Sequence, residues 1–163
     1  MKQGCNEITP EIVKTLFAQG GAFSNSSYMQ MRSVKGYSMT EFLLELAEGQ
    51  SREFAIFSDK DECLGTIRLS QKDMMAQTIK LHLFCNPKHQ EKALELSQEL
   101  SRICSSLFLN EHLCRVYCYL LKTELSAQNV LLEAGFIKEV TLLEHAFFNG
   151  SYHTVMVYGR VKE

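Results

Sequence analysis

Residues 84–100 of this chain of 163 residues read FCNPKHQEKALELSQEL, and the change of pattern inside this stretch decides the fold. The end of an apolar strand is followed by Asn86-Pro87 and then by a segment with helical spacing. That segment and its continuation carry apolar residues at steps of three and four, namely Ala93, Leu96, Leu100, Ile103 and Leu107. Such spacing is typical of one face of an amphipathic helix. The stretch therefore predicts a strand that runs directly into a long helix.

Strands are predicted on both sides of this helix. Before it, 54–57 and 64–69 flank a turn-like cluster at 58–62, and the alternating run 77–85 follows as a third strand. After it, residues 113–121 are almost wholly apolar, which predicts a strand buried on both faces. The helix would then be the crossover between two parallel strands.

The two ends of the chain complete the predicted order. A helix opens at Thr9-Pro10, a polar loop covers 22–38, and a second helix stops at Gly49. At the other end, a helix at 126–133 ends at Gly135, a natural C-cap. Strands 137–148 and 151–161 follow and are joined by Asn-Gly, a strong hairpin signal. We expect a mixed α/β sheet in one domain, residues 1–163.

Composition narrows the class of protein. The formal net charge is −2, and the chain has no basic run, so neither nucleic acid nor an anionic membrane is an expected partner. The N-terminus lacks the apolar core of a signal peptide, and no apolar run reaches the length of a membrane span. We expect a cytoplasmic protein.

The six cysteines are interpreted as thiols rather than as metal ligands or disulfides. Five of them fall inside apolar segments, where cysteine behaves as a small buried hydrophobe. His112, Cys114 and Cys118 lie close together in sequence, but residues 113–121 are a predicted strand and no CxxC pair or second cluster completes a tetrahedral set. No metal site is therefore predicted.

Three local stretches, taken in order, point to a known family. Residues 61–67 (DECLGTI), 131–136 (LLEAGF) and 143–153 (LEHAFFNGSYH) resemble successive landmarks of the GCN5-related N-acetyltransferases (GNAT). The last stretch is similar to the branch that contains ribosomal-protein and polyamine acetyltransferases. The resemblance covers about residues 50–163 well. It implies a GNAT-like mixed sheet with a central splayed parallel strand pair, helices on both faces and a C-terminal β-hairpin.

The resemblance also implies a site for acetyl-CoA between the splayed strands. In the family, the pantetheine arm pairs with the first strand, and the pyrophosphate lies on a Gln/Arg-x-x-Gly-x-Gly/Ala loop at the next helix start. That loop corresponds to residues 90–95 of this chain. The cofactor-binding residues so implied are Leu83, Phe84, Cys85, Gln90, Glu91, Lys92, Ala93 and Leu94.

Two positions of the loop depart from the family pattern. Gln90 matches, but Ala93 replaces the first glycine and Glu95 replaces the final small residue. Ala93 adds only a methyl group, whereas Glu95 facing a phosphate would cost about 1 kcal/mol per charge pair at 4 Å in water, and more in a drier cleft. We expect weakened binding of acetyl-CoA. In the alternative interpretation, Glu91 and Glu95 simply favour the helix dipole and no ligand binds.

The catalytic residues of the family are not in their usual places. The family's tyrosine acid corresponds to Leu131, and its helix-start asparagine corresponds to Glu124. Acetyl transfer still needs a neutral amine, a stabilised oxyanion and a proton for the leaving thiolate. We predict His82 and Tyr119 as the catalytic residues, with backbone N–H groups near Phe84 for the oxyanion. The alternatives are that Tyr119 is a core residue and that His82 points away.

Three interpretations of the function fit these observations. The first is an acetyl-CoA-dependent N-acyltransferase acting on a primary amine of a small molecule or a protein N-terminus. The second is a catalytically silent GNAT-fold binding protein with a degenerate CoA site, and a third is the use of another CoA-type or carrier-linked donor. Loop 22–38 and the last hairpin would shape the acceptor pocket, with Tyr28, Met29, Met31 and Tyr37. Many GNAT proteins dimerise, so a homodimer is left open.

Overall fold

The described part of this computed structural model comprises residues 4–9, 11–13, 44, 47, 51–148 and 150–162. Its strands are β1 (Gly4–Glu7), β2 (Arg52–Phe57), β3 (Cys63–Asp73), β4 (Thr78–Cys85), β5 (Arg115–Leu121), β6 (Ile137–Phe148) and β7 (Ser151–Val161). Its full helices are the 3-10 helix η1 (Pro87–Lys92) and the α-helices α4 (Ala93–Asn110) and α5 (Leu125–Glu133). A first helical turn at 11–13 follows Thr9, whose hydroxyl accepts the Ile12 N–H at 3.5 Å.

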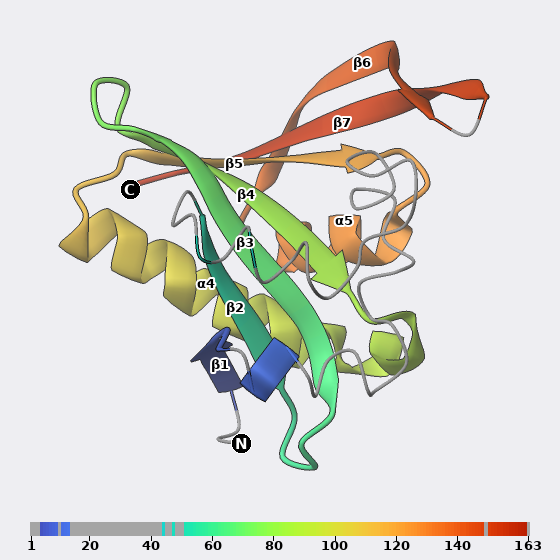
Figure 1. The fold of residues 1–163 in the computed structure, drawn as a ribbon. Coiled ribbons are helices and arrows are strands. Elements are labelled where there is room, and N and C mark those ends of the chain that lie inside the picture. Colours follow the sequence, from blue (N-terminus) through green and yellow to red (C-terminus); the bar gives the residue numbers. More distant parts are fainter. Residues whose placement is uncertain are drawn as a thin grey trace.

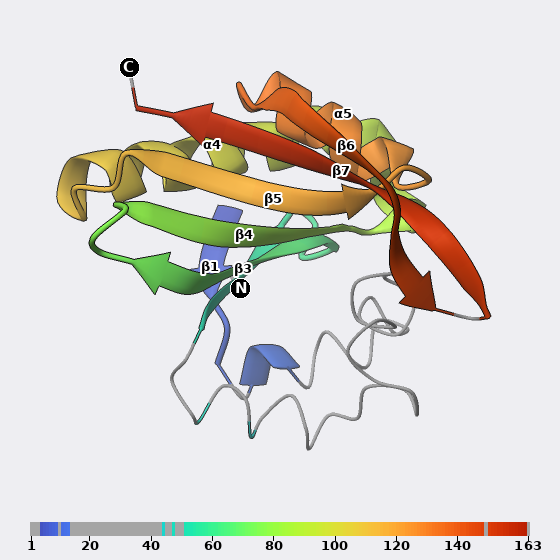
Figure 2. The same cartoon turned by 90° about the horizontal axis from the view of Figure 1, so that it is seen from above.

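The seven described strands form a single sheet in the order β1-β2-β3-β4-β5-β7-β6 (Figure 1). Among these strands only β4 and β5 are parallel, because α4 connects them as a crossover, and all other neighbours are antiparallel. α4 and α5 cover one face of the sheet, and the helical turn at 11–13 lies on the other side (Figure 2). The predicted mixed α/β sheet, with one parallel strand pair and a C-terminal β-hairpin, is confirmed.

The core lies between the sheet and the two long helices. It combines the α4 face centred on Leu96, Leu100 and Leu107 with inward residues of the central strands, such as Leu81 and Cys118. All five of these residues are at most 2% exposed. The core residues of α4 include the predicted apolar positions, with Ala93 and Ile103 at the margin of the cluster. Period-3.6 patterning therefore places this helix on the sheet as expected.

The turn chemistry also follows the sequence. Gly135 adopts φ +83° directly after α5, and the Phe136 N–H donates to the Leu131 carbonyl at 2.9 Å, as in a helix C-cap with a left-handed residue. Phe148 and Ser151 pair at the end of the last hairpin, and Gly150 has φ +76°. The other member of the Asn-Gly pair lies outside the described residues.

Two expectations are corrected. β5 is not buried on both faces, because Arg115 and Tyr117 are half-buried and Tyr119 is exposed. Its buried residues are Val116, Cys118, Leu120 and Leu121, and the two tyrosines alternate with Val116, Cys118 and Leu120 on the less buried face. In addition, β1 pairs antiparallel with β2 and was not predicted, because its four residues carry no strand-like alternation. The predicted second helix and the 22–38 loop lie outside the described residues.

Near the C-terminus of α4, Glu111 connects two strands by ion pairs. Its carboxylate oxygens each lie 2.7 Å from a cation, Arg52 Nη1 and Lys72 Nζ. Burial raises the pKa of Glu111, but hydrogen bonds from Lys72 and Arg52 outweigh it, so the pKa is lowered. The stabilisation is therefore present at neutral pH and is lost as the pH falls through the acidic range in which Glu111 is protonated.

We expect Glu111→Gln to reduce the loss of stability between neutral pH and about pH 4 by up to about 1 kcal/mol, the size typical of a partly exposed pair. Urea unfolding at the two pH values measures this loss. Glu133→Gln, an exposed substitution on α5, serves as the control. Identical acid dependence in Glu111→Gln and the wild type would contradict the assignment.

Candidate active site

The parallel strands β4 and β5 separate at a defined point. Their ladder runs from Thr78↔Arg115 to Leu81↔Cys118 and ends there, although the strands continue to Cys85 and Leu121. We call this point the fork. A crossover helix begins just beyond β4, so the fork opens toward the starts of η1 and α5.

A pocket of about 380 Å³ lies at the open end of the fork. Its described lining consists of Leu83, Phe84, Cys85, Pro87 and Gln90 on one side and Thr123, Glu124, Leu125, Ser126 and Ala127 on the other. Four of the residues predicted to bind the cofactor (Leu83, Phe84, Cys85 and Gln90) are thus brought together. The β5–α5 side was missed, although the family's asparagine position had already pointed to Glu124.

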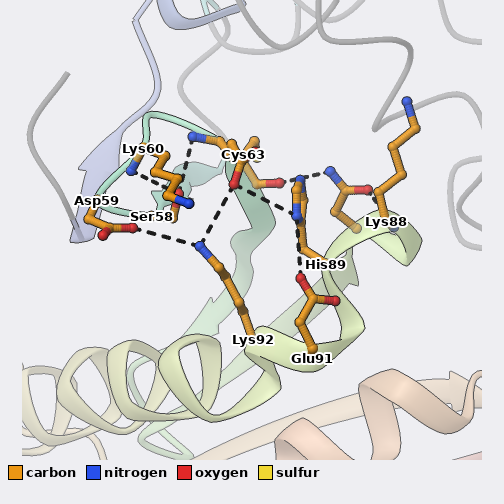
Figure 3. Close-up of polar contacts among 10 residues, drawn as sticks. Ser58, Asp59, Lys60, Cys63, Lys88, His89, Glu91 and Lys92 are labelled. Carbon is orange, nitrogen blue, oxygen red and sulfur yellow. Dashed lines mark hydrogen bonds and ion pairs between the residues drawn. The ribbon is translucent and has the colours of Figure 1, made fainter.

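The other four predicted residues have different environments. Lys92 Nζ lies 3.7 Å from both Asp59 and Glu62 in the β2–β3 turn (Figure 3). Glu91 lies 3.8 Å from His89 Nδ1. Ala93 packs against the core and Leu94 is 60% exposed. None of these four side chains lines the fork pocket among the residues described for it.

Asn86 connects η1 to the β2–β3 hairpin by hydrogen bonds. Its Nδ2 donates to the Cys63 carbonyl at 2.8 Å, its Oδ1 accepts the Lys88 N–H at 3.1 Å, and its own N–H donates to the Leu64 carbonyl at 2.9 Å. The segment after β4 begins as a 3-10 helix, and the Asn86 side chain takes up one of its first N–H groups. Fewer backbone donors are therefore left for an anion than in an uncapped α-helix.

Glu95 lies on the opposite side of α4 from the fork pocket. It lines a separate pocket of about 340 Å³ with Gly4, Ile56, Phe57 and other residues toward the β1 edge. Glu95 is not among the described residues that line the fork pocket, so the predicted repulsion would act only on a phosphate that extends beyond this pocket.

The predicted catalytic pair occupies adjacent positions just past the last ladder pair. Core residues Leu81 and Cys118 face α4 and α5, so His82 and Tyr119 point to the other face of the sheet. His82 is 7% exposed and its Nε2 lies 2.9 Å from Ser70 Oγ. Tyr119 is 39% exposed, with the Lys80 ammonium 4.9 Å from its ring centroid. Tyr119 is therefore not a core residue.

Other candidates are less well placed. Leu131 is fully buried in the core, so the family's acid position carries no proton donor. Glu144 and His145 fall in a break of the β6–β7 register, where Glu144 has φ +48° and strand alternation does not fix the face on which each side chain lies. Burial and the charge of Glu124 raise the pKa of Cys85 to about 12, which leaves its thiol un-ionised and unsuited as a nucleophile.

All six cysteines are free thiols. Cys114 is exposed, contrary to the expectation for its apolar segment, and its thiol donates to Gln77 Oε1 at 2.8 Å. Among the described residues, no three His, Cys, Asp or Glu side chains are grouped as a metal site would need. Over the same ranges, no helix combines the length and apolarity required to span a membrane.

Comparison with known proteins supports the fold. No family model matches the chain, and no curated protein is significantly similar to it in sequence. The solved spermidine N-acetyltransferase of Vibrio cholerae in complex with CoA and spermine superposes with a TM-score of 0.76 at 18% identity, covering 96% of this chain and 94% of that one. A second structure, of the spermidine/spermine N-acetyltransferase of Vibrio cholerae in complex with manganese ions, gives 0.71 at 17% identity and covers 96% of this chain and 91% of that one. The chain thus has the fold of these acetyltransferases.

Proposed function

We propose that the protein is an acetyl-CoA-dependent N-acyltransferase that acts on a primary amine of a small molecule or a protein N-terminus. One observation carries the proposal, namely the pocket at the fork between β4 and β5. It lies where the GNAT resemblance places the acyl donor. The fold shared with an acetyltransferase crystallised with CoA and spermine supports the same assignment.

The pocket lining offers groups that could hold the donor. The β4 backbone at 83–85 borders the pocket, and Gln90 offers an amide near the start of η1. Glu91 and Lys92 direct their side chains to other partners, and the Ala93 N–H donates to the Gln90 carbonyl, so among the predicted residues Leu83, Phe84, Cys85 and Gln90 would hold the donor. When bound, acetyl-CoA would supply the activated acyl group.

His82 and Tyr119 are the residues of this chain proposed to handle protons. An imidazole has a near-neutral pKa in model peptides and can accept a proton from an amine, and a tyrosine hydroxyl can donate one. Both side chains follow the last β4–β5 pair on one face of the sheet, where Tyr119 is exposed and His82 is buried beside Ser70, so an amine approaching from that face would meet Tyr119 first. A reducing compartment such as the cytoplasm suits six free thiols.

A second candidate function is binding without catalysis. It is favoured by Leu131, which is fully buried where the family has its acid, and by Asn86, whose side chain takes up the Lys88 N–H. Such a protein would bind a partner through the same fold and release no CoA from acetyl-CoA.

Calorimetric titration of acetyl-CoA into the reduced protein tests the proposal, with 3′-dephospho-CoA and pantetheine as weaker ligands. We expect saturable micromolar binding. Ser126→Phe should weaken it at least about tenfold, equal to about 1.4 kcal/mol, because a phenyl ring would fill the pocket. Asn129→Phe, an exposed change on the same helix, should leave binding unchanged.

The acceptor is then sought by following CoA thiol release with polyamines, amino acids and peptide N-termini. Turnover with any of them supports the transferase. Turnover with spermidine or spermine would mean that the protein shares its acceptor, as well as its fold, with the structural neighbours. Binding of acetyl-CoA without turnover would favour the silent module. Absence of binding would overturn the proposal.

A further inference from the structure

A second pocket, of about 450 Å³, lies where β7 continues past the start of β6 (Figure 2). β6 begins at Ile137, which pairs with Gly159, whereas β7 continues to Val161. Among the described strands, the end of β7 therefore has a neighbour only on its β5 side. The pocket fills this place between the C-terminal half of α4, the start of β6 and residues 159–162. We call it the β7 notch.

Two cations of the notch have only neutral hydrogen-bond acceptors. Arg160 Nη1 donates to the Ala134 carbonyl at 2.7 Å and to Ser101 Oγ at 3.0 Å. Lys162 Nζ donates to the Phe108 carbonyl at 3.2 Å. Neither cation has a carboxylate partner among the described residues. The other described arginines each pair with a glutamate, namely Arg52, Arg68, Arg102 and Arg115.

The backbone offsets only part of this positive charge. The Phe108 carbonyl belongs to the last turn of α4, and the Ala134 carbonyl directly follows α5. The C-terminal end of a helix carries about half of a negative elementary charge. Two helix ends therefore offset about one of the two positive charges, and about one remains.

The acidic residue of the notch lies on the other face of β7 from the two cations. Glu139 forms an ion pair with Arg115, and its carboxylate occupies the place that a Cβ of Gly159 would take. Tyr158 belongs to the core under α4, so Arg160 faces α4 as well, and Gly159 faces the opposite way. Glu139 therefore compensates Arg115 and leaves the charge on the α4 side in place.

The rest of the notch is mainly apolar. Leu109, Ile137 and Val161 line it and are 69%, 65% and 58% exposed. Phe108 contributes to the wall, with the Arg160 guanidinium 6.0 Å from its ring centroid. Exposed apolar side chains around a cavity of a few hundred Å³, with a few polar groups among them, are typical of a site for a small molecule.

We infer that the β7 notch binds a small amphipathic anion, namely a carboxylic acid with an apolar chain. Its single negative charge matches the positive charge that remains. Arg160 and Lys162 have N–H groups beyond those bonded to the carbonyls, and these can donate to a carboxylate. The apolar chain would contact Leu109, Ile137 and Val161.

This site is separate from the fork. Val161 pairs with Arg115 at the first residue of β5, whereas the fork opens toward Leu121 at its last residue. The two ends of a strand of this length are about 20 Å apart. The inference therefore stands or fails independently of the transferase activity proposed above.

Titration of octanoate into the ¹⁵N-labelled protein, followed by amide NMR, tests the inference. We expect saturable shifts at residues 105–109, 135–139 and 159–162. Two probes with the same chain length, the neutral 1-octanol and the cationic octyltrimethylammonium, should bind at least about fivefold more weakly, because they lack the negative charge.

Two variants locate the bound probe. Ser105→Phe should weaken octanoate at least about tenfold, because a phenyl ring would fill the pocket, whereas Ser106→Phe at the exposed neighbouring position should not. Lys162→Gln should weaken octanoate about fivefold and leave 1-octanol unchanged. Lys122→Gln, at an exposed lysine near the fork, is its control.

Absence of saturable shifts in the notch would overturn the inference, as would equal affinities for octanoate and 1-octanol. Wild-type octanoate affinity in Lys162→Gln would show that the cations only cap the two helices. If Ser105→Phe does not fold, Lys162→Gln decides, since Lys162 is exposed. A folded Ser105→Phe protein should keep wild-type affinity for acetyl-CoA, and loss of that affinity would contradict two separate sites.

Discussion

Replacing Arg68 by leucine should destabilise the protein by about 3–5 kcal/mol, the usual cost of removing one partner from a buried ion pair. Arg68 on β3 pairs in register with Glu53 on β2, and its Nε forms an ion pair with Glu53 Oε1. Both residues are buried, with 6% and 4% exposure. Loss of the guanidinium would remove this ion pair from a carboxylate that lies away from water.

Urea unfolding is measured for four proteins, namely the wild type, the two single leucine variants and the double variant Glu53→Leu/Arg68→Leu. The comparison separates the free energy of the ion pair from the cost of burying an unpaired charge. The double variant should be more stable than either single variant, because no buried charge is left uncompensated. Arg102→Leu is the matched control. Arg102 also pairs with a glutamate, Glu99, but its side chain is 74% exposed, so its loss should cost less than about 1 kcal/mol. A cost below about 1 kcal/mol for Arg68→Leu would show that the pair does not support the sheet.

Gly65→Ala should damage both the stability and the donor site. Gly65 pairs with Cys85, and a Cβ at this position would lie 2.4 Å from the Phe84 carbonyl oxygen and 3.0 Å from Leu96 Cδ2. The first contact is with backbone, so β4 must move away from β3 to relieve it. Overpacking of this kind costs about 1–3 kcal/mol. Since Phe84 and Cys85 line the fork pocket, we expect affinity for acetyl-CoA to fall at least about tenfold, equal to about 1.4 kcal/mol.

The control is Gly150→Ala. Gly150 has φ +76°, but nothing lies within 4 Å of an added Cβ, so the substitution should cost only the conformational strain of about 1–2 kcal/mol. Its affinity for acetyl-CoA should be unchanged. Thermal unfolding and calorimetric titration of both variants measure the two effects. Wild-type affinity in a folded Gly65→Ala protein would show that the end of β4 does not contact the donor.

Most of the fold could be predicted from local sequence patterns. The steps of three and four along α4, the alternation in 77–85 and the Asn-Gly pair each reflect interactions within a few residues or one buried face. β1 could not be predicted in this way, because its four residues form a strand only where β2 supplies the hydrogen-bonding partner. The prediction that β5 is buried on both faces was wrong for a related reason, because the apolar composition of a strand does not show which of its faces is covered.

The candidate site was predicted only on one side. Leu83, Phe84, Cys85 and Gln90 follow from the strand end and the resemblance, and they do meet in the fork pocket. The opposite wall comes from the β5–α5 turn, which lies beyond the whole of α4 and β5 along the chain, so no local pattern could place it there.

The chain alone therefore determined the order of its elements, the crossover that makes β4 and β5 parallel, and the absence of a proton-donating side chain at Leu131. These are properties of periodicity, turn residues and residue identity. Only the tertiary structure decided where charges lie relative to the fork. The rotation of α4 turns Glu95 toward β1, and the β5–α5 turn brings Glu124 into the pocket wall. Electrostatic energy depends on distance in space, and packing sets that distance for residues far apart in sequence.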